Sequence, residues 1–277
     1  MKKCTVCGHT EGGYRIDIED ATLEGAGRVW VDGQEYSVTR QGTANGVNTY
    51  VIIDSPNATN MVTYTFNDPG ATDIHTQYPV GMKVWALERR GDGYVAKRVK
   101  ELDNLLQYSG SSIRIAGVKG IRMITSVPQK SKSALTGKGL AGYTLVEYGT
   151  ALAWASDLDE DNPLILGQPY TKSNYAYKKD VADPIFANKN GMTQYTNVLV
   201  GFSLDQWKDG IAMRPYIILE DTAGKQTTLY GGIIYRSIGY IAYQNRNVFR
   251  TSSGAYDYVW EIIHHVYGDQ YDADYKG

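Results

Sequence analysis

The chain has 277 residues, which is enough for about two domains of ordinary size. Lys and Arg number 28 and Asp and Glu 30, giving a formal net charge of −2. This balance excludes a general binder of nucleic acid or anionic lipid, because such proteins need an excess of positive charge. With 23 Tyr and 30 Gly, the composition favours strands and tight turns over long helices.

The first 13 residues are polar, have no hydrophobic period and end in Gly12-Gly13, which is typical of a linker or docking arm. They lack the apolar stretch of a signal peptide. No window of the sequence approaches the roughly 18 apolar residues of a membrane span. We expect an N-terminal arm over residues 1–13, a packed fold from Tyr14 onward and no membrane span.

Two β-hairpins are predicted before residue 100, since a hydrophobic run lies on each side of Asp32-Gly33 and of Asp92-Gly93. Further β-forming runs at 50–53 and 62–66 raise the expected number of strands to five or six. We therefore predict a small β domain over residues 14–106.

The remainder of the chain also alternates apolar and polar residues in the way that strands do. The shorter runs lie at 112–115 and 121–124, each with an Arg on the face opposite its apolar groups. Longer β-forming runs follow at 143–155, 196–202, 216–219 and 227–230, and a turn over 221–224 joins the last two. These runs predict a larger β-rich domain over residues 107–277.

One helix is expected, near the C-terminus. Val259, Ile262, Ile263 and Val266 have the i, i+3, i+4, i+7 spacing of a helix face, with Ser252 or Ser253 as cap and Gly268 as stop. The predicted fold class is mainly β, with two β-sandwich or barrel-like domains and one C-terminal helix.

A zinc site is the first candidate for bound metal. Cys4, Cys7 and His9 supply two thiols and an imidazole within six residues, which is half of a zinc knuckle. The chain has no other cysteine, so a fourth ligand would come from elsewhere. A local disulfide and an unliganded arm are the alternatives.

A calcium loop is the second candidate. Asp157, Asp159 and Asp161 match the 1, 3, 5 spacing of such a loop. The match fails further along, because Asn162 stands where the loop has Gly and Gln168 where it has Glu. A solvated acidic turn is therefore the favoured interpretation.

Aromatic rings are the candidate binding groups, because a flat amphipathic ring stacks on sugar faces and forms protein interfaces at low entropic cost. Packing within the fold explains such rings equally well. The candidates are Tyr78, Trp85, Tyr94, Tyr170, Tyr175 and Tyr177.

Catalytic signatures are absent from the sequence: it contains no Gly-x-Ser-x-Gly, Gly-x-x-x-x-Gly-Lys-Ser/Thr, His-Glu-x-x-His or Gly-x-Gly-x-x-Gly motif in a fitting context. A glycosidase needs only two carboxylates at a set separation, which leaves no sequence signature. We expect a protein without catalytic activity, with a secreted polysaccharide-active enzyme as an alternative.

Several segments between residues 110 and 245 resemble a module of large surface proteins of anaerobic Gram-positive bacteria. They lie at 120–126, 142–150, 195–201, 214–216 and 236–240. The eight residues that begin at Cys4 also resemble the short Cys-x-x-Cys-Gly units of such proteins. The resemblance implies an extracellular, multi-domain context beside adhesion or carbohydrate-binding modules, and it transfers no catalytic residue.

We therefore expect a non-catalytic extracellular or cell-surface protein that acts by binding a glycan or protein partner. A structural protein of a phage virion or a filament is an alternative. The N-terminal arm would allow homo-oligomers to form by docking onto a neighbouring subunit.

Overall fold

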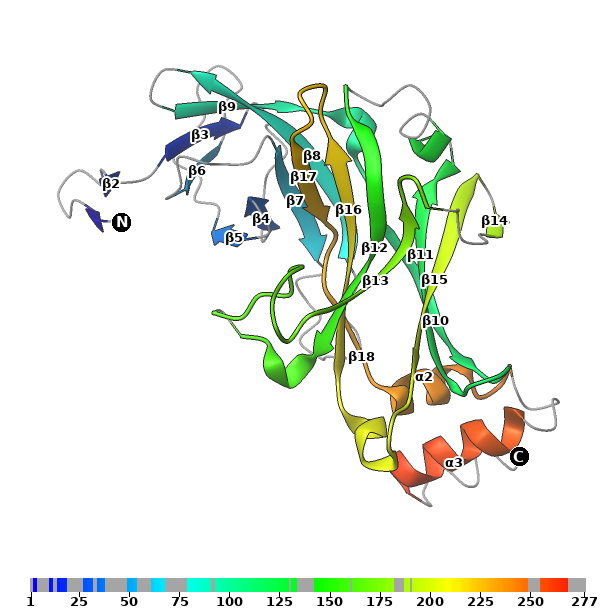
Figure 1. The fold of residues 1–277 in the computed structure, drawn as a ribbon. Coiled ribbons are helices and arrows are strands. Elements are labelled where there is room, and N and C mark those ends of the chain that lie inside the picture. The colour runs from blue at the N-terminus through cyan, green and yellow to red at the C-terminus, as the bar shows by residue number, and fades with distance from the viewer. Residues whose placement is uncertain are drawn as a thin grey trace.

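A computed structural model describes most of the chain from residue 93 onward and selected strands before it (Figure 1). Side chains are described for residues 84–86, 99–129, 131–133, 142–159, 161–181, 191–248 and 257–268. The backbone alone is described for 2–3, 10–11, 14–18, 27–31, 34–37, 49–53, 61–67, 79–83, 87–90, 93–98, 187–189 and 255–256.

The strands of the N-terminal part form a seven-stranded sheet. Its order is β5 (Gln34–Ser37), β4 (Gly27–Val31), β7 (Met61–Asn67), β8 (Pro79–Arg90), β9 (Gly93–Arg98), β3 (Tyr14–Ile18) and β6 (Thr49–Ile53). All neighbours are antiparallel except β3 and β9. A separate ribbon pairs β1 (Lys2–Lys3) with β2 (Thr10–Glu11).

Both predicted hairpins are present. Val31 pairs with Gln34, so Asp32-Gly33 connects β4 and β5 as expected. Arg90 pairs with Gly93, so the second connection is Gly91-Asp92, one residue earlier than predicted.

Two antiparallel sheets make up the rest of the β structure that is described. The four-stranded sheet has the order β10 (Gln107–Arg114), β11 (Gly120–Pro128), β15 (Met192–Val200) and β14 (Ala187–Lys189). The five-stranded sheet has the order β13 (Lys172–Lys178), β12 (Thr144–Trp154), β16 (Ile211–Glu220) and β17 (Gln226–Tyr230), and β18 (Ile234–Arg236) also pairs with β16. The mainly β class is confirmed, but the sheets are not closed into a barrel.

The turn between β16 and β17 is confirmed. Asp221 Oδ1 accepts hydrogen bonds from the backbone N–H groups of Ala223 and Lys225, both at 2.9 Å. Gly224 has a φ of +80°, which glycine adopts without strain.

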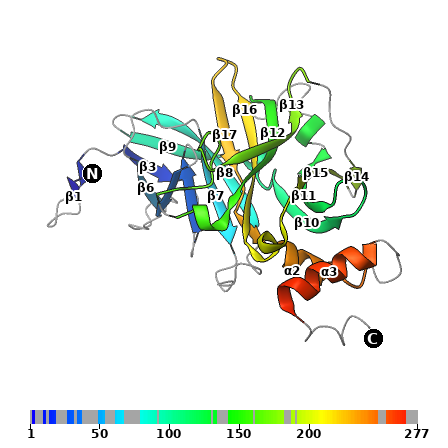
Figure 2. The same ribbon diagram turned by 60° about the horizontal axis from the view of Figure 1, so that its bottom comes forward.

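The predicted C-terminal helix is α3 (Ala255–Tyr267), and it stops at Gly268 as expected, with a φ of +75°. Its proposed caps, Ser252 and Ser253, lie outside the described residues. A second helix, α2 (Ile238–Asn245), was not predicted, so the expectation of one helix is wrong. Ser237 caps α2 by accepting a hydrogen bond from the N–H of Tyr240. Figures 1 and 2 show the two helices side by side at one end of the sheets.

Among the described residues, three short 3-10 helices join the larger elements: η1 (Lys100–Leu102), η2 (Ala155–Asp157) and η3 (Leu204–Lys208). In the described part of the chain, no helix is long and apolar enough to cross a membrane.

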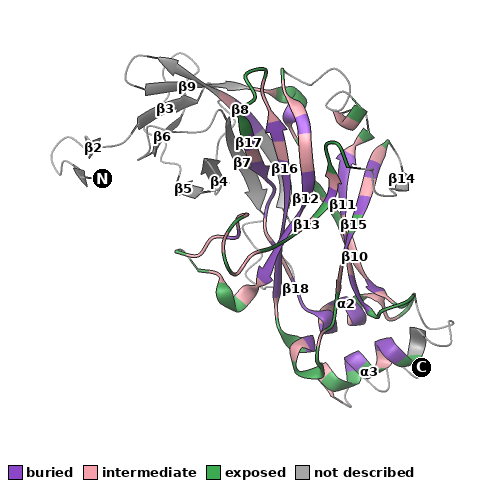
Figure 3. Cartoon of the chain, in the orientation of Figure 1, coloured by how far each residue is buried: buried purple, intermediate pink, exposed green. Residues whose placement is uncertain are grey.

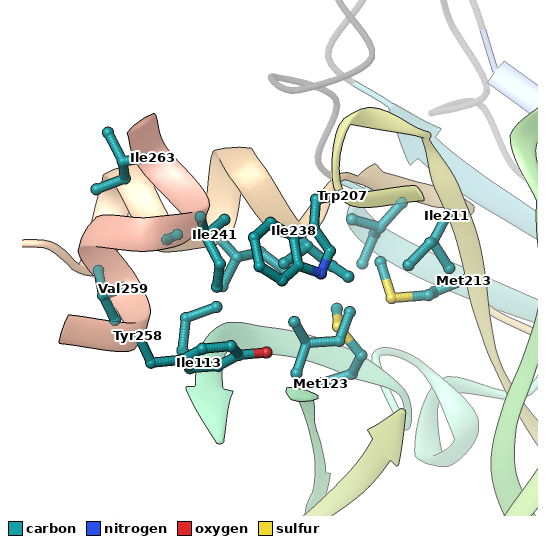
Figure 4. Packing of buried hydrophobic residues seen from close by; sticks show 14 of the residues in the cluster. Ile113, Met123, Trp207, Ile211, Met213, Ile238, Ile241, Tyr258, Val259 and Ile263 are labelled. Carbon is teal, nitrogen blue, oxygen red and sulfur yellow. The ribbon is translucent and has the colours of Figure 1, made fainter. Parts of the chain in front are cut away.

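The helices are held by an apolar cluster that they share with the ends of the strands (Figure 4). Trp207 of η3 meets Tyr258 of α3 edge to face, with ring centroids 6.1 Å apart. Because each buried aliphatic side chain contributes roughly 1.5 to 3 kcal/mol, this cluster fixes η3 and α3 firmly. Its labelled members also include Ile113, Met123, Ile211, Met213, Ile238, Ile241, Val259 and Ile263.

A second apolar cluster joins the four-stranded and five-stranded sheets, whose buried residues Figure 3 marks in purple. Tyr148 of β12 and Tyr195 of β15 lie with ring centroids 4.9 Å apart. The hydroxyl of Tyr195 donates to the backbone oxygen of Gly149, and the hydroxyl of Thr150 donates to Asn197 Oδ1 at 2.6 Å. Buried contacts of both kinds, apolar and polar, therefore set the register of one sheet against the other.

Candidate functional site

The expected zinc ligands Cys4, Cys7 and His9 lie outside the described residues, as does Tyr78. Tyr94 lies on β9, opposite Arg89 of β8, and its side chain is not described. The zinc site and the role of these two tyrosines remain predictions.

Trp85 is a correction to the set of expected binding residues. Its side chain is fully buried, and so is that of Val84 beside it. Because successive residues of a strand point to opposite faces, both faces of β8 are covered at this point. Trp85 is therefore a packing residue and presents no surface to a partner.

Tyr175 and Tyr177 both lie on β13, an edge strand of the five-stranded sheet. Tyr175 is 48% exposed, with the Lys178 ammonium 5.7 Å from its ring centroid. Tyr177 is half-buried and stacks on Tyr148, with centroids 5.5 Å apart and planes 14° from parallel. Tyr175 is available to a partner, whereas Tyr177 mainly packs against the core between the sheets.

Asp157, Asp159 and Asp161 are all exposed. Asp159 Oδ1 accepts hydrogen bonds from the N–H of Asp161 and from both the N–H and the side-chain amide of Asn162, all within 3.0 Å. These bonds lower the pKa of Asp159. Among the described residues no three acidic, His or Cys side chains are placed to share a metal ion. The calcium site remains a prediction.

Tyr170 is the predicted aromatic residue that lies in a cleft. The cleft has a volume of about 250 Å³ and lies at the end of the two facing sheets. Antiparallel pairing creates it: Leu152 of β12 lies opposite Lys172, which begins β13, and Trp154, which ends β12, lies opposite Ile211, which begins β16. The cleft is lined by Leu152, Ala153, Trp154, Tyr170, Lys172, Leu199, Val200, Gly201, Phe202, Gln206 and Ile211.

The floor of the cleft is rigid and its rim is aromatic. Leu152 and Ile211 are only 5% and 4% exposed and belong to the cluster that holds the helices. Trp154 and Phe202 are half-buried and meet edge to face, with ring centroids 6.0 Å apart. Apolar ring surface is therefore presented at a site whose base is fixed by the core.

The position of Tyr170 is set by a hydrogen bond to a backbone segment that a buried arginine anchors to the core. The guanidinium of Arg214, which is fully buried, donates to the backbone oxygens of Leu164 and Gly231, both at 3.0 Å. The hydroxyl of Tyr170 in turn donates to the backbone oxygen of Pro163 at 2.9 Å. Burial, with a smaller effect from the Asp159 charge, raises the pKa of Tyr170, so its phenol stays neutral.

The polar groups of the cleft are hydrogen-bond donors. Gln206 Oε1 accepts from the N–H of Ser203 at 3.0 Å and completes the N-terminal cap of η3. This bond leaves the amide NH₂ of Gln206 as a donor. The indole N–H of Trp154 and the ammonium of Lys172 are further side-chain donors of the lining, whereas the hydroxyl of Tyr170 already donates to Pro163.

A second polar group of the five-stranded sheet lies outside the cleft lining and does not resemble a reactive site. The hydroxyl of Tyr216 donates to Glu147 Oε1 at 2.5 Å, and Glu147 Oε2 is 3.1 Å from the ammonium of Lys178. Burial, and then the hydrogen bond to Glu147, raise the pKa of Tyr216. A phenol held neutral in this way serves as a structural donor.

The sequence indicated Tyr170 but not the other cleft residues. Trp154, Lys172 and Phe202 come from three separate segments that meet only through strand pairing and sheet packing. The one available signal was an aromatic residue at or next to the end of two predicted strands. These residues are Trp154 in 143–155 and Phe202 in 196–202.

Comparison of the chain with protein-family models, with curated proteins and with solved structures finds no match. The class that the fold and the site define is a mainly β protein with a small, aromatic-lined cleft at the end of two facing sheets.

Proposed function

We propose that this protein is a non-catalytic binding protein that recognises carbohydrate through the cleft lined by Trp154, Tyr170 and Phe202. The observation that carries the proposal is the combination of exposed ring surface with free N–H donors over a buried apolar floor. Sugar rings present apolar C–H faces and polar hydroxyls side by side, which this combination fits.

The size of the cleft fits a ligand as small as one sugar ring. About 250 Å³ is near the lower end of the roughly 300 to 1,000 Å³ that is usual for ligand sites. One sugar ring of a longer chain would occupy it, with neighbouring rings on the surface outside.

The wider setting is part of the same proposal. The resemblance to bacterial surface-protein modules supports an extracellular or cell-surface location. We also propose the domain division at about residue 106 and a β-sandwich formed by the four-stranded and five-stranded sheets. The contacts of Tyr148 with Tyr195 and of Thr150 with Asn197 support the sandwich.

A glycan array tests the proposed function. Wild-type protein is expected to bind a subset of oligosaccharides, and Val200→Trp is expected to abolish binding. Val200 lines the cleft but is 46% exposed, so a larger side chain fills the cleft without disturbing the core. Tyr170→Ala provides a second variant that removes ring surface.

The matched control is Tyr175→Ala, which removes an exposed ring outside the cleft lining. It is expected to retain most of the binding. Loss of binding in Tyr175→Ala with retention in Val200→Trp would place the site on β13 and overturn the proposal. Shortening of a bound oligosaccharide during incubation would favour the polysaccharide-active enzyme, and concentration-dependent filaments without glycan binding would favour the structural protein.

A further inference from the structure

Lys172 differs from the two lysines at the other end of its strand, Lys178 and Lys179. Lys178 is paired with Glu147 at 3.1 Å, and Lys179, just beyond the strand, is paired with Glu220 at 3.3 Å. The ammonium of Lys172 has no ion pair or hydrogen bond with any described residue, although Lys172 lines the cleft. Its ammonium is a compact charge with three donor hydrogens.

The other side-chain N–H groups of the cleft are also without a protein acceptor. Within the described part of the chain, neither the indole N–H of Trp154 nor the amide NH₂ of Gln206 has a hydrogen-bond partner. The lining therefore offers three separate kinds of donor, carried on β12, β13 and η3.

Negative charge is lacking at the same place. None of the described residues that line the cleft is Asp or Glu. Asp159, whose charge acts on Tyr170, already accepts three hydrogen bonds through Oδ1 from Asp161 and Asn162. A carboxylate on the ligand would therefore meet hydrogen-bond donors and a positive charge in the lining and no negative charge.

We propose that the cleft selects acidic saccharides and that the ammonium of Lys172 contacts a uronic-acid carboxylate. This inference rests on the proposed carbohydrate-binding function. Hydrogen bonds between an ammonium and a carboxylate are about twice as strong as bonds between neutral groups. The carboxylate is attached directly to the sugar ring, so stacking on the aromatic rim and contact with Lys172 can occur together. Gln206 and Trp154 would donate to ring hydroxyls or to the second carboxylate oxygen.

The experiment compares each acidic oligosaccharide with its carboxyl-reduced counterpart. The probes are trisaccharides of galacturonate, glucuronate and mannuronate, each paired with the neutral trisaccharide that has the same linkages. Dissociation constants are measured for the wild-type chain, Lys172→Gln, Lys172→Arg and the control Lys178→Gln. Lys178→Gln removes one positive charge from the same strand but lies outside the cleft lining.

We expect at least one acidic member to bind about tenfold more tightly than its neutral counterpart, which is the usual effect of one charge-assisted hydrogen bond. Lys172→Gln should reduce this preference to about onefold, because the positive charge that favours the acidic member is lost. Lys172→Arg and Lys178→Gln should retain it. The preference should also weaken as NaCl is raised toward 1 M, because salt screens exposed charges.

Equal affinity for acidic and neutral members, or a preference that survives in Lys172→Gln, would overturn the inference. If the wild-type protein nevertheless binds saccharides and Val200→Trp does not, the proposed carbohydrate-binding function still holds. Absence of binding to every member of the pairs and of the wider array would overturn both.

Discussion

The indole ring of Trp154 and the phenyl ring of Phe202 meet edge to face, with centroids 6.0 Å apart. Trp154 ends β12 of the five-stranded sheet, and Phe202 follows β15 of the four-stranded sheet. This contact therefore joins the two sheets at the point where the cleft opens. It contributes to the stability of the fold and also to the ring surface that a ligand would meet.

Replacing Phe202 with Ala should lower the free energy of unfolding by about 1 to 3 kcal/mol, since an edge-to-face contact and the burial of a ring are both lost. Urea denaturation measures the change. Leu204→Ala is the control, because Leu204 is 47% exposed two residues away and should change stability by less than about 0.5 kcal/mol. Equal effects of the two substitutions would contradict the structural role of the ring pair.

The hydrogen bond from Thr150 to Asn197 should be among the more costly to remove. Thr150→Val keeps the shape of the side chain but leaves Asn197 Oδ1 buried without its donor, at a cost of about 1 to 3 kcal/mol. Thr196→Val makes the same chemical change at an exposed position of β15 and is expected to be nearly neutral. Chemical denaturation compares the two variants. Equal denaturation midpoints would show that the hydrogen bond between the sheets adds no stability.

Stability should fall at alkaline pH. Burial raises the pKa of Tyr195, Tyr216 and Tyr230 above the ordinary value of 10.0 for a phenol. Above about pH 10 the unfolded chain releases protons that the folded chain keeps. The free energy of unfolding therefore decreases as pH rises, by up to about 1.4 kcal/mol per pH unit for each phenol, and is unaffected by these groups below pH 10.

Denaturation between pH 8 and pH 11 tests this expectation. Tyr216→Phe removes one such phenol, so its stability should decline less steeply with pH than that of the wild-type protein, although its stability at pH 8 is lower because the bond to Glu147 is lost. A variant whose pH dependence matched that of the wild-type protein would show that Tyr216 does not contribute.

Gly201 forms part of the cleft and has a φ of +83°. No atom lies within 4 Å of a Cβ added there, so substitution carries a backbone cost only. Gly201→Ala should lower stability by about 1 kcal/mol, and Gly201→Asn by less, because Asn tolerates the left-handed region better. Thermal melts would contradict this account if Ala proved less costly than Asn at this position.

Local patterns predicted the elements that depend on local sequence. Alternation of apolar and polar residues located β11 and the second part of β10, longer β-forming runs located β12, β15, β16 and β17, and the helical period located α3. The strands β13, β14 and β18 were not predicted. The helix α2 was missed because it is short and follows a strand directly, and its Ser237 cap gave too weak a signal by itself. The open sheets depend on pairings between distant segments, which no local pattern contains.

The candidate site was predicted in the same partial way. Tyr170 was recognised by residue type alone, while Lys172, Gln206 and Phe202 acquire their role only when β13, η3 and the end of β15 come together. Trp85 had the same residue type as a binding aromatic but lies in a strand covered on both faces. Residue type indicates what a side chain can do, and packing decides whether a partner can reach it.

The most direct test of carbohydrate binding at the cleft is an NMR titration that follows the indole N–H signals of the five tryptophans. The probe is the oligosaccharide that binds best in the array, and Trp154→Phe assigns the signal of Trp154. We predict that the Trp154 signal shifts with saturation while those of the buried Trp85 and Trp207 stay in place. A saturable titration in which Trp154 does not move and another tryptophan does would contradict the account.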